Sequence, residues 1–433
     1  MFDRSGTPAD SPAHELALGC LEAGIDAAHP RRAVARHCSV DERDGTLTVR
    51  DACYDLSAYD SIRLIGGGKA ADDLAAAFEE LLGDRLSGGV VVTDERTADP
   101  DRIDVLEGEH PTPGDGSVAG ARAVLNCAAA ATDRTLVIGA IAGGGSALLC
   151  APAAGLSAAD LQAVTDDLLD AGASIDELNT VRRACSSIKG GGLAAAAKPA
   201  TTVGILVSDV VGGDPSIIAS GPTVPTETDP DAALAVLARY GVDVPAVESF
   251  LRGSTPEGPA DTDVDTHVVA SGRDAIDAAV EHASSRGYRT CVISTRIEGE
   301  ARAAGRLHAA VAAEAADSGD PVEPPAVILS GGETTVRVTG DGTGGPNGEF
   351  ALAAAMDLPN PAVLGAVDTD GGDGSTDAAG ALVDAGTVDD PAAARAALSD
   401  NDSYTFLESR RALLRSGATG TNVNDLRVLV VPA

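Results

Sequence analysis

The stretch Ser61-Ile62-Arg63-Leu64-Ile65-Gly66-Gly67-Gly68-Lys69 decides the fold assignment of this chain. An apolar strand over Ser61–Ile65 runs into three glycines and a lysine, and an alanine-rich helix is expected from Lys69 to Leu82. Glycines let the backbone approach an anionic group, the helix N-terminus offers free amides, and the ammonium adds a positive charge. This unit predicts an α/β fold with a loop suited to phosphate.

Lys69 stands out because lysine is rare elsewhere in the chain. Of the 31 basic residues only three are lysines, namely Lys69, Lys189 and Lys198. The loop also fits the dinucleotide fingerprint G-x-G-x-x-A, with Asp94 as a ribose ligand at the end of the next strand. A Walker A loop is excluded, since Arg63 replaces its first glycine and Ala70 its hydroxyl residue. A tight turn with a solvated lysine remains a structural alternative.

Composition indicates a protein adapted to concentrated salt. The formal net charge is −35, with 66 acidic against 31 basic residues, and 44% of the residues are apolar. Self-repulsion of this size is costly in dilute salt and is screened at molar salt, where the Debye length is about 3 Å. We therefore expect a cytoplasmic protein of an extreme halophile that uses salt-in osmotic balance. The acidity argues against nucleic-acid binding.

The hydrophobic pattern, the N-terminal segment and the cysteines indicate in which compartment the protein works. No stretch of about 20 apolar residues is free of charge, so we expect no membrane span. The start of the chain lacks the basic and apolar regions of a secretory signal. Seven scattered cysteines, without any Cys-x-x-Cys pair, argue against a zinc site or a disulfide framework and for a reducing compartment.

Apolar runs alternate with alanine-rich helical stretches along the whole chain, which is typical of an α/β protein with a mostly parallel sheet. A helical segment is expected over 14–37. The stretch from Gly253 to Asp265 is rich in proline, glycine and acid, so we place a domain boundary there. The predicted domains are 1–255 and 256–433. Strands predicted in the second half include 326–329 and 334–338.

Several glycine-rich or acidic turns follow predicted strands, where open α/β sheets place ligands. Gly143-Gly144-Gly145-Ser146 offers consecutive amides to an anion, and a flexible turn is the alternative. Asp209 and Asp214 follow a buried strand, which suits a general base or a Mg²⁺ contact, although a lone surface aspartate is common in so acidic a chain. Asp368, Asp370, Asp373 and Asp377 form an acidic cluster. It is not an EF-hand, because Ala379 occupies position 12.

Taken in order, these motifs resemble the glycerate 2-kinase family with a C-terminal MOFRL domain, whose relatives are sometimes named hydroxypyruvate reductases. The matching segments start near residue 60 and reach the C-terminus: Gly66–Ala70, His110–Pro113, Gly143–Leu149, Asn179–Arg182, Ser186–Ala194, Ser208–Asp214, Ser220–Thr223, Ser330–Thr335, Asp370–Asp384 and Gly420–Leu426.

The resemblance implies ATP- and Mg²⁺-dependent phosphorylation of D-glycerate on its 2-hydroxyl, in a cleft between two α/β domains. It implies an N-terminal Rossmann-like three-layer sandwich with a mostly parallel sheet. A smaller C-terminal α/β domain would contain the MOFRL region, about 325–430. The expected partners are ATP and glycerate, not nucleic acid or membrane, and a homodimer is the oligomer we consider.

Site residues are carried over by position. The candidate catalytic residues are Lys69, which would contact phosphate, and Asp209, which would orient or deprotonate the hydroxyl. The candidate cofactor-binding residues are Gly66, Gly67, Gly68, Gly143, Gly144, Gly145, Ser146, Lys189, Glu333 and Asn347. The candidate metal ligands are Asp209, Asp214 and Asp370.

Two family arginines are replaced in this chain, by Gly192 and by Pro346. Arginine would bind phosphate or carboxylate bidentately at such positions. Another cation (Arg182, Arg183 or Lys189) could take over, or the acceptor could be a related small hydroxy acid. An NAD(P)H-dependent hydroxypyruvate reductase and a non-catalytic nucleotide or solute sensor are the competing hypotheses.

Overall fold

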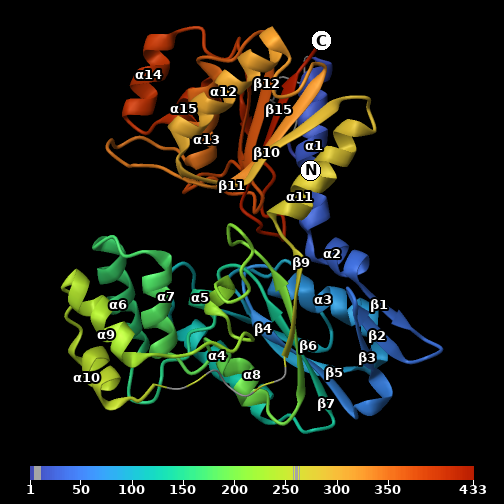
Figure 1. Cartoon of the computed structure of the whole chain (residues 1–433), viewed down its shortest axis with the longest axis vertical. Coiled ribbons are helices and arrows are strands. Elements are labelled where there is room, and N and C mark those ends of the chain that lie inside the picture. Colours follow the sequence, from blue (N-terminus) through green and yellow to red (C-terminus); the bar gives the residue numbers. More distant parts are fainter. Residues whose placement is uncertain (4–10, 257, 259–261, 263) are drawn as a thin grey trace. The chain divides into compact units, whose positions relative to one another are not determined.

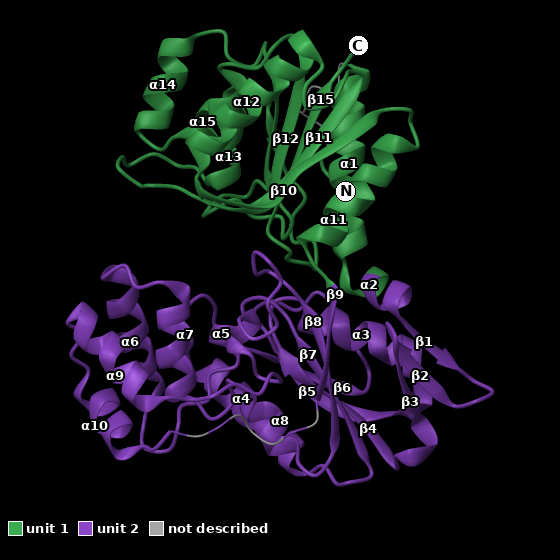
Figure 2. Ribbon diagram, in the orientation of Figure 1, with its two compact units in different colours: residues 1–32, 270–433 green, residues 33–269 purple. Residues whose placement is uncertain are grey.

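The computed structural model describes residues 1–3, 11–256, 258, 262 and 264–433. The chain forms two compact units (Figure 2). Unit 1 comprises residues 1–32 and 270–433, and unit 2 comprises residues 33–269. Both combine helices with a sheet, which confirms the predicted α/β class (Figure 1). No helix formed by the described residues is both long and apolar enough to cross a bilayer.

Unit 2 is built on a sheet whose order, within the described residues, is β6-β5-β4-β7-β8-β9. Its strands are β4 (Ser61–Gly67), β5 (Leu86–Thr93), β6 (Ile103–Glu107), β7 (Thr135–Ile141), β8 (Thr201–Val207) and β9 (Val264–Ala270). The pairs from β6 through β8 are parallel. With β4 counted as the first strand, this is the doubly wound order 3-2-1-4-5-6, and its switch point lies between β4 and β7. The Rossmann-like prediction is therefore confirmed.

Helices surround this sheet and also form a separate helical core. Those that contact the sheet are α3 (Ala71–Leu82), α4 (Asp115–Ala129), α5 (Gly145–Leu148) and α8 (Gly192–Ala197), and α2 (Pro30–His37) precedes them in the chain. The others are α6 (Ala158–Asp170), α7 (Ile175–Ala184), α9 (Pro230–Tyr240) and α10 (Pro245–Gly253), which bury leucines and valines against one another. Capping boxes at Ser157 and Ser174 start α6 and α7.

A small antiparallel sheet, which we did not predict, precedes β4. It consists of β1 (Cys38–Asp41), β2 (Thr46–Val49) and β3 (Ala52–Asp55) in that order. The strands are only four residues long, which is too short for a clear alternation of apolar and polar residues.

Unit 1 has a mixed sheet in the order β10-β11-β15-β12-β13-β14. Its strands are β10 (Arg289–Glu300), β11 (Ala326–Thr335), β12 (Val363–Asp368), β13 (Gly380–Asp384), β14 (Leu413–Leu414) and β15 (Asp425–Val431). Only the β10–β11 pair is parallel among these described strands. The sheet is thus largely antiparallel, unlike that of unit 2.

Helices cover both faces of the unit 1 sheet. One apolar cluster joins α1 (Pro12–Ala28) and α11 (Gly272–Ser284) to Val327, Val428 and their neighbours. A second cluster joins α12 (Ala301–Ser318), α13 (Pro346–Ala355), α14 (Pro391–Ser399) and α15 (Ser403–Ser409) to Ile328 and Leu429. Adjacent residues of β11 and β15 belong to different clusters, because successive strand side chains point to opposite faces.

The N-terminal segment differs from the expectation in two ways. The helix expected over 14–37 is broken at His29, which has an extended backbone and precedes Pro30, so α1 and α2 are separate. Helix α1 belongs to unit 1, since Leu21 and Ile25 are fully buried with residues of α11 and β15. The compact units therefore divide the chain differently from the expected 1–255 and 256–433. Residues 257, 259–261 and 263 of the expected boundary lie outside the described residues.

Residues 326–329, expected as one strand, continue without a break to Thr335 in β11, so only the first two residues of the strand expected over 334–338 lie in a strand. The two strands were expected to be separate, and the structure joins them through Ser330-Gly331-Gly332. The glycines stay in the ladder because β10 and β15 pair with them on either side. Sequence alone suggested a turn, since glycine is usually disfavoured within strands.

At Gly66 the backbone of β7 leaves no space for a side chain, and we expect Gly66→Ala to destabilise the protein. A Cβ at this position would overlap the carbonyl oxygen of Ala140. The expected loss is about 2 kcal/mol or more in the free energy of unfolding, measured by denaturant titration at high salt. Gly253→Ala is the control, because its Cβ would meet nothing within 4 Å. Equal stability of the two variants would contradict this account.

Candidate active site

Two glycine loops meet at the switch point of unit 2. The loop after β4 carries Gly68 and Lys69, and the loop after β7 carries Gly143 and Gly144. The backbone N–H of Lys69 donates to the carbonyl oxygen of Gly143 at 2.8 Å. The N–H of Ala142 donates to the carbonyl oxygen of Gly67 at 3.1 Å. The structure thus brings together the two loops that the sequence singled out separately.

Gly68 shows why this loop requires glycine. Its φ is +136°, and a Cβ there would overlap the backbone of Ala142. Any other residue would suffer both a strained backbone and a clash. The close approach of the two loops therefore depends on the absence of a side chain at this position.

Asp209 joins the two loops from the third strand, β8. The backbone N–H of Gly144 hydrogen-bonds to its carboxylate, and a Cβ at Gly143 would overlap that carboxylate. Burial raises the pKa of Asp209 above its ordinary value, while the N–H of Gly144 and the positive charge of Lys69 act in the opposite direction. A carboxylate with a raised pKa is a stronger base than a solvated aspartate. The geometry thus suits proton removal from a hydroxyl.

His110 is a neighbour of these residues that the sequence reasoning did not single out as a site residue. A Cβ on Gly144 would lie 3.1 Å from Cγ of Lys69 and 3.2 Å from Cδ2 of His110. The His110 Nδ1 is 3.8 Å from Oδ2 of Asp94. Its place in the segment His110–Pro113 was the only signal in the sequence.

A chain of side-chain hydrogen bonds stabilises the second glycine loop through Ser146. The hydroxyls of Ser146 and Ser220 are 3.0 Å apart, and Ser220 donates to Oδ1 of buried Asn179 at 2.9 Å. Sequence reasoning matched Asn179 and Ser220 to motifs but gave them no role. They lie 41 residues apart in the chain, so only the fold shows that they act on the same loop.

Lys189 is attached to the same loop. Its ammonium donates to the carbonyl oxygen of Ser146 at 2.8 Å, and the residue is only 7% exposed. Burial, and after it the positive charge of Arg182, lowers the pKa of Lys189 to about 7. Both causes disfavour the ammonium form. Lys189 is therefore a buried amine that titrates near neutrality.

Asp214 lies further along the loop that carries Asp209, and its carboxylate stabilises the turn that it starts. It is exposed, and its Oδ1 accepts from the N–H of Ser216 at 2.9 Å and from its hydroxyl at 2.8 Å. Among the described residues, no group of three or more His, Cys, Asp or Glu side chains is arranged to hold a metal ion. A Mg²⁺ site does not need such a group, because Mg²⁺ in phosphoryl-transfer sites binds one or two carboxylates and otherwise phosphates and water. Asp209 offers such a carboxylate.

Three predicted residues belong to unit 1. Glu333 is exposed on β11, opposite Glu298 of β10. Asn347 is buried at the start of α13, where its side-chain nitrogen donates to Oδ1 of Asp425 at 2.7 Å. Asp370 follows β12, and its Oδ1 accepts from the N–H of Gly372 at 2.9 Å. Asp425 connects this region, since it pairs in register with Gly332 of β11 and with Asp368, the last residue of β12.

The two positions that lack the arginines have distinct local structures. Pro346 is the first residue of α13, a position where the missing N–H costs no helical hydrogen bond. Gly192 is the first residue of α8, and a Cβ there would overlap the carbonyl oxygen of Ser187. The backbone around Gly192 therefore leaves no space for a side chain without a shift.

Residues 16–252 match the family described as "Domain of unknown function (DUF4147)", and residues 326–425 match the MOFRL family. Among curated relatives, a D-glycerate 2-kinase of Thermotoga maritima is 36% identical and a glycerate 2-kinase of Pyrococcus horikoshii is 37% identical. The alignments cover 95% and 96% of this chain and 97% of each relative.

A protein of Agrobacterium vitis that bears the name of a hydroxypyruvate reductase is 42% identical over 85% of this chain and 86% of its own length. The crystal structure of a glycerate kinase from Thermotoga maritima superposes with a TM-score of 0.85, at 35% identity. That superposition covers 96% of this chain and 99% of the other. The similarity thus extends over both units.

The chain contains only three lysines, so the titration of Lys189 can be measured directly. With ¹³C-labelled lysine, we expect the Cε signal that disappears in Lys189→Met to titrate near pH 7, because burial and Arg182 disfavour its ammonium form. Lys198→Met, a change at an exposed lysine, is the control that should leave this signal in place. Titration of the assigned signal above about pH 9, close to the ordinary lysine value, would contradict the structure.

Proposed function

The chain belongs to the glycerate 2-kinase family with a C-terminal MOFRL region, and from this premise we propose that it transfers the γ-phosphoryl group of ATP to the 2-hydroxyl of D-glycerate. The observation that carries the proposal is the meeting of Lys69 and Asp209 at the two glycine loops of unit 2. A cation for the transferring phosphoryl group and a base for the hydroxyl are the two groups that such a transfer needs.

The proposed reaction assigns each group a defined task. The glycerate O2 atom attacks the γ-phosphorus, and the bond from that phosphorus to the β–γ bridging oxygen breaks to release ADP. The hydroxyl proton passes to the carboxylate of Asp209, whose raised pKa favours its acceptance. Lys69 neutralises charge on the phosphoryl oxygens, and the backbone amides of Gly143, Gly144 and Gly145 are proposed to face an anionic group.

The chemistry that Mg²⁺ supplies when bound is neutralisation of the nucleotide phosphates. Asp209, Asp214 and Asp370 are the proposed candidates for its carboxylate ligands, because carboxylate oxygens are the donors that Mg²⁺ prefers. If Asp209 bound the ion, it would orient the hydroxyl and another group would take the proton. Glu333, Asn347 and Lys189 remain proposed contacts of the cofactor. Gly192 and Pro346 replace two arginines of the family, and the cation that takes their place would affect which acceptor binds. A related small hydroxy acid is therefore included among the substrates to be tested.

The second candidate is a hydroxypyruvate reductase, favoured by the doubly wound order and by the names of some relatives. A dinucleotide pyrophosphate would sit at the N-terminus of α3. That position carries the buried carboxylates of Asp72 and Asp73, and Oδ2 of Asp72 already accepts the backbone N–H of Thr97 at 2.6 Å. Two acidic side chains disfavour an anion there, so the kinase hypothesis is the stronger one.

A single comparison separates these functions. The protein is incubated in molar KCl with ATP, Mg²⁺ and D-glycerate, and the phosphoglycerate isomers are resolved. A parallel reaction follows NADH oxidation with hydroxypyruvate. We expect 2-phosphoglycerate and no NADH oxidation. NADH oxidation without phosphoryl transfer would establish the reductase, and neither reaction would favour a sensor.

Lys69→Ala should lower kcat at least about tenfold, because one charge contact to the transferring phosphoryl group is lost. Its unfolding midpoint should stay close to that of the parent protein. Lys198→Ala is the matched control, since it removes an exposed lysine of the same unit. Turnover that is equally high in both variants would refute the role of Lys69.

We also propose that the chain works at high salt, as its net charge of −35 suggests. The unfolding midpoint should rise steadily from dilute to molar KCl, because salt screens the repulsion among the carboxylates. Circular dichroism during heating measures it, with sucrose at equal osmolality as an uncharged control. A midpoint that is independent of KCl would contradict adaptation to salt.

A further inference from the structure

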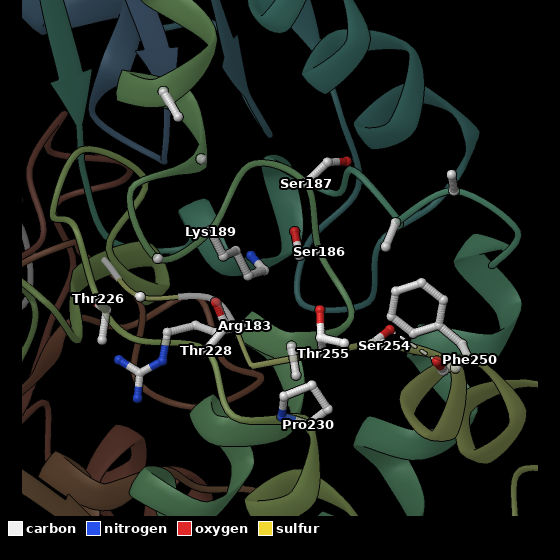
Figure 3. A pocket seen from close by; sticks show the side chains of 18 residues that line it. Arg183, Ser186, Ser187, Lys189, Thr226, Thr228, Pro230, Phe250, Ser254 and Thr255 are labelled. Atoms are coloured by element: carbon white, nitrogen blue, oxygen red, sulfur yellow. Dashed lines mark hydrogen bonds between the residues drawn. The ribbon is translucent and has the colours of Figure 1, made fainter. Parts of the chain in front are cut away.

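A second feature of unit 2 is a cavity of about 580 Å³ beside the helical core. It is bounded by the loop 186–192 and by residues of α7, α9 and α10. Figure 3 shows its lining, with Arg183 and Phe250 on opposite sides of the view. A volume of this size is typical of sites for small molecules.

The charge of this cavity differs from that of the rest of the molecule. Its described lining contains two cations, Arg183 and Lys189, and no aspartate or glutamate. The whole chain has 66 acidic against 31 basic residues. A cationic cavity in so acidic a protein indicates a site for an anion, since the surrounding negative charge would otherwise repel one.

Arg183 is available to such an anion. Its guanidinium makes no hydrogen bond or ion pair with any described residue, although Asp176 and Asp214 act on it electrostatically. Burial lowers the pKa of Arg183, so its guanidinium has lost part of its hydration. The guanidinium is only half-buried, so water still solvates part of it, and a bound anion would replace some of that water with a direct ionic partner. Its planar fork of donors matches the oxygens of phosphate.

Lys189 offers the second contact. It uses one donor for the carbonyl oxygen of Ser146, and an ammonium has three. The positive charge of Arg182 also disfavours its ammonium form, and no carboxylate is among the groups that shift its pKa. A bound anion would relieve the repulsion between these two cations.

The rest of the lining is suited to a polar ligand with one flat or apolar part. The hydroxyl residues Ser187, Thr226 and Thr228 line the cavity, and Phe250 offers an aromatic ring. We propose that this cavity binds the phosphate group of a small molecule through Arg183 and Lys189. The proposal rests on the proposed function, since Lys189 is also a candidate contact of the cofactor, and it adds Arg183 as a second phosphate-binding cation. A nucleotide and a phosphorylated hydroxy acid share this chemistry.

Isothermal titration of the full-length protein in molar KCl distinguishes the two sources. The probes are ADP, 2-phosphoglycerate and inorganic phosphate, each titrated into the parent protein, Arg183→Gln and Arg252→Gln. Arg252 is the matched control, an exposed arginine on α10 that pairs with Glu248 at 2.6 Å and does not line the cavity. We expect Arg183→Gln to weaken binding at least about tenfold, as for loss of a charge-assisted contact, and Arg252→Gln to change it little.

If ADP binds but 2-phosphoglycerate does not, and Arg183→Gln weakens the binding of ADP, the cavity is a nucleotide site. If 2-phosphoglycerate binds but ADP does not, with the same dependence on Arg183, the cavity is a site for the phosphorylated acid. Absence of binding, or equal weakening in both variants, overturns the proposal. Kinase activity together with either of these negative results would refute the cavity site while leaving the proposed reaction intact.

A second measurement covers the case in which Arg183→Gln does not fold. In the parent protein, the ¹³Cε signal of Lys189 should move when the probe that binds is added to saturation, because a phosphate beside the amine raises its pKa. The Lys198 signal serves as the internal control. A Lys189 signal that stays unchanged at saturation would show that the phosphate binds elsewhere.

Discussion

The parallel pairing of β4 with β7 is the interaction on which the candidate site depends. Both strands end in glycine-rich loops, and the strands approach so closely at Gly66 that a Cβ would overlap the backbone of Ala140. This approach brings the N–H of Lys69 onto the carbonyl of Gly143. The same loop then donates the N–H of Gly144 to Asp209. Lys69 and Asp209, which are 140 positions apart, thus both contact the loop Gly143–Gly144. They can do so because glycine at position 66 lets the backbones of β4 and β7 approach.

Unit 1 is organised around a buried polar network at the end of its sheet. Arg427 is fully buried, pairs with Asp425, donates to Thr334 at 2.9 Å and lies over the ring of Phe350. Asp373 accepts the N–H groups of Asn347 and Gly348 and so caps α13. Burial raises the pKa of Asp373 to about 7 despite these bonds. Part of the acidic cluster therefore has a structural task.

The sequence predicted local structure well wherever the signal was continuous. The buried strand expected before Asp209 was confirmed as β8, because a parallel strand buried on both faces is a nearly continuous apolar run. The loops around Gly66 and Gly143 were identified for the same reason, since each follows such a strand. The site residues themselves stay predictions, although the structure brings Lys69 and Asp209 together.

What the sequence did not predict depends on contacts between distant segments. Asn179 and Ser220 meet only through the fold, and the small sheet before β4 has strands too short for a pattern. The glycines of β11 suggested a turn, but pairing with strands on both sides holds them extended. The cavity at Arg183 is likewise formed by segments separated by more than 60 residues. Local propensity carries no information about such neighbours.

The discontinuity of unit 1 has a consequence for synthesis on the ribosome. Helix α1 leaves first, yet its partners in α11 and β15 are among the last residues made. At the usual rates of translation, residues 33–433 take roughly 20 to 80 s to appear. Unit 2 is contiguous and can complete its sheet during that interval. The apolar face of α1 therefore lacks its partners in α11 and β15 until the last residues of the chain have been made. Unit 1 can be completed only after that point.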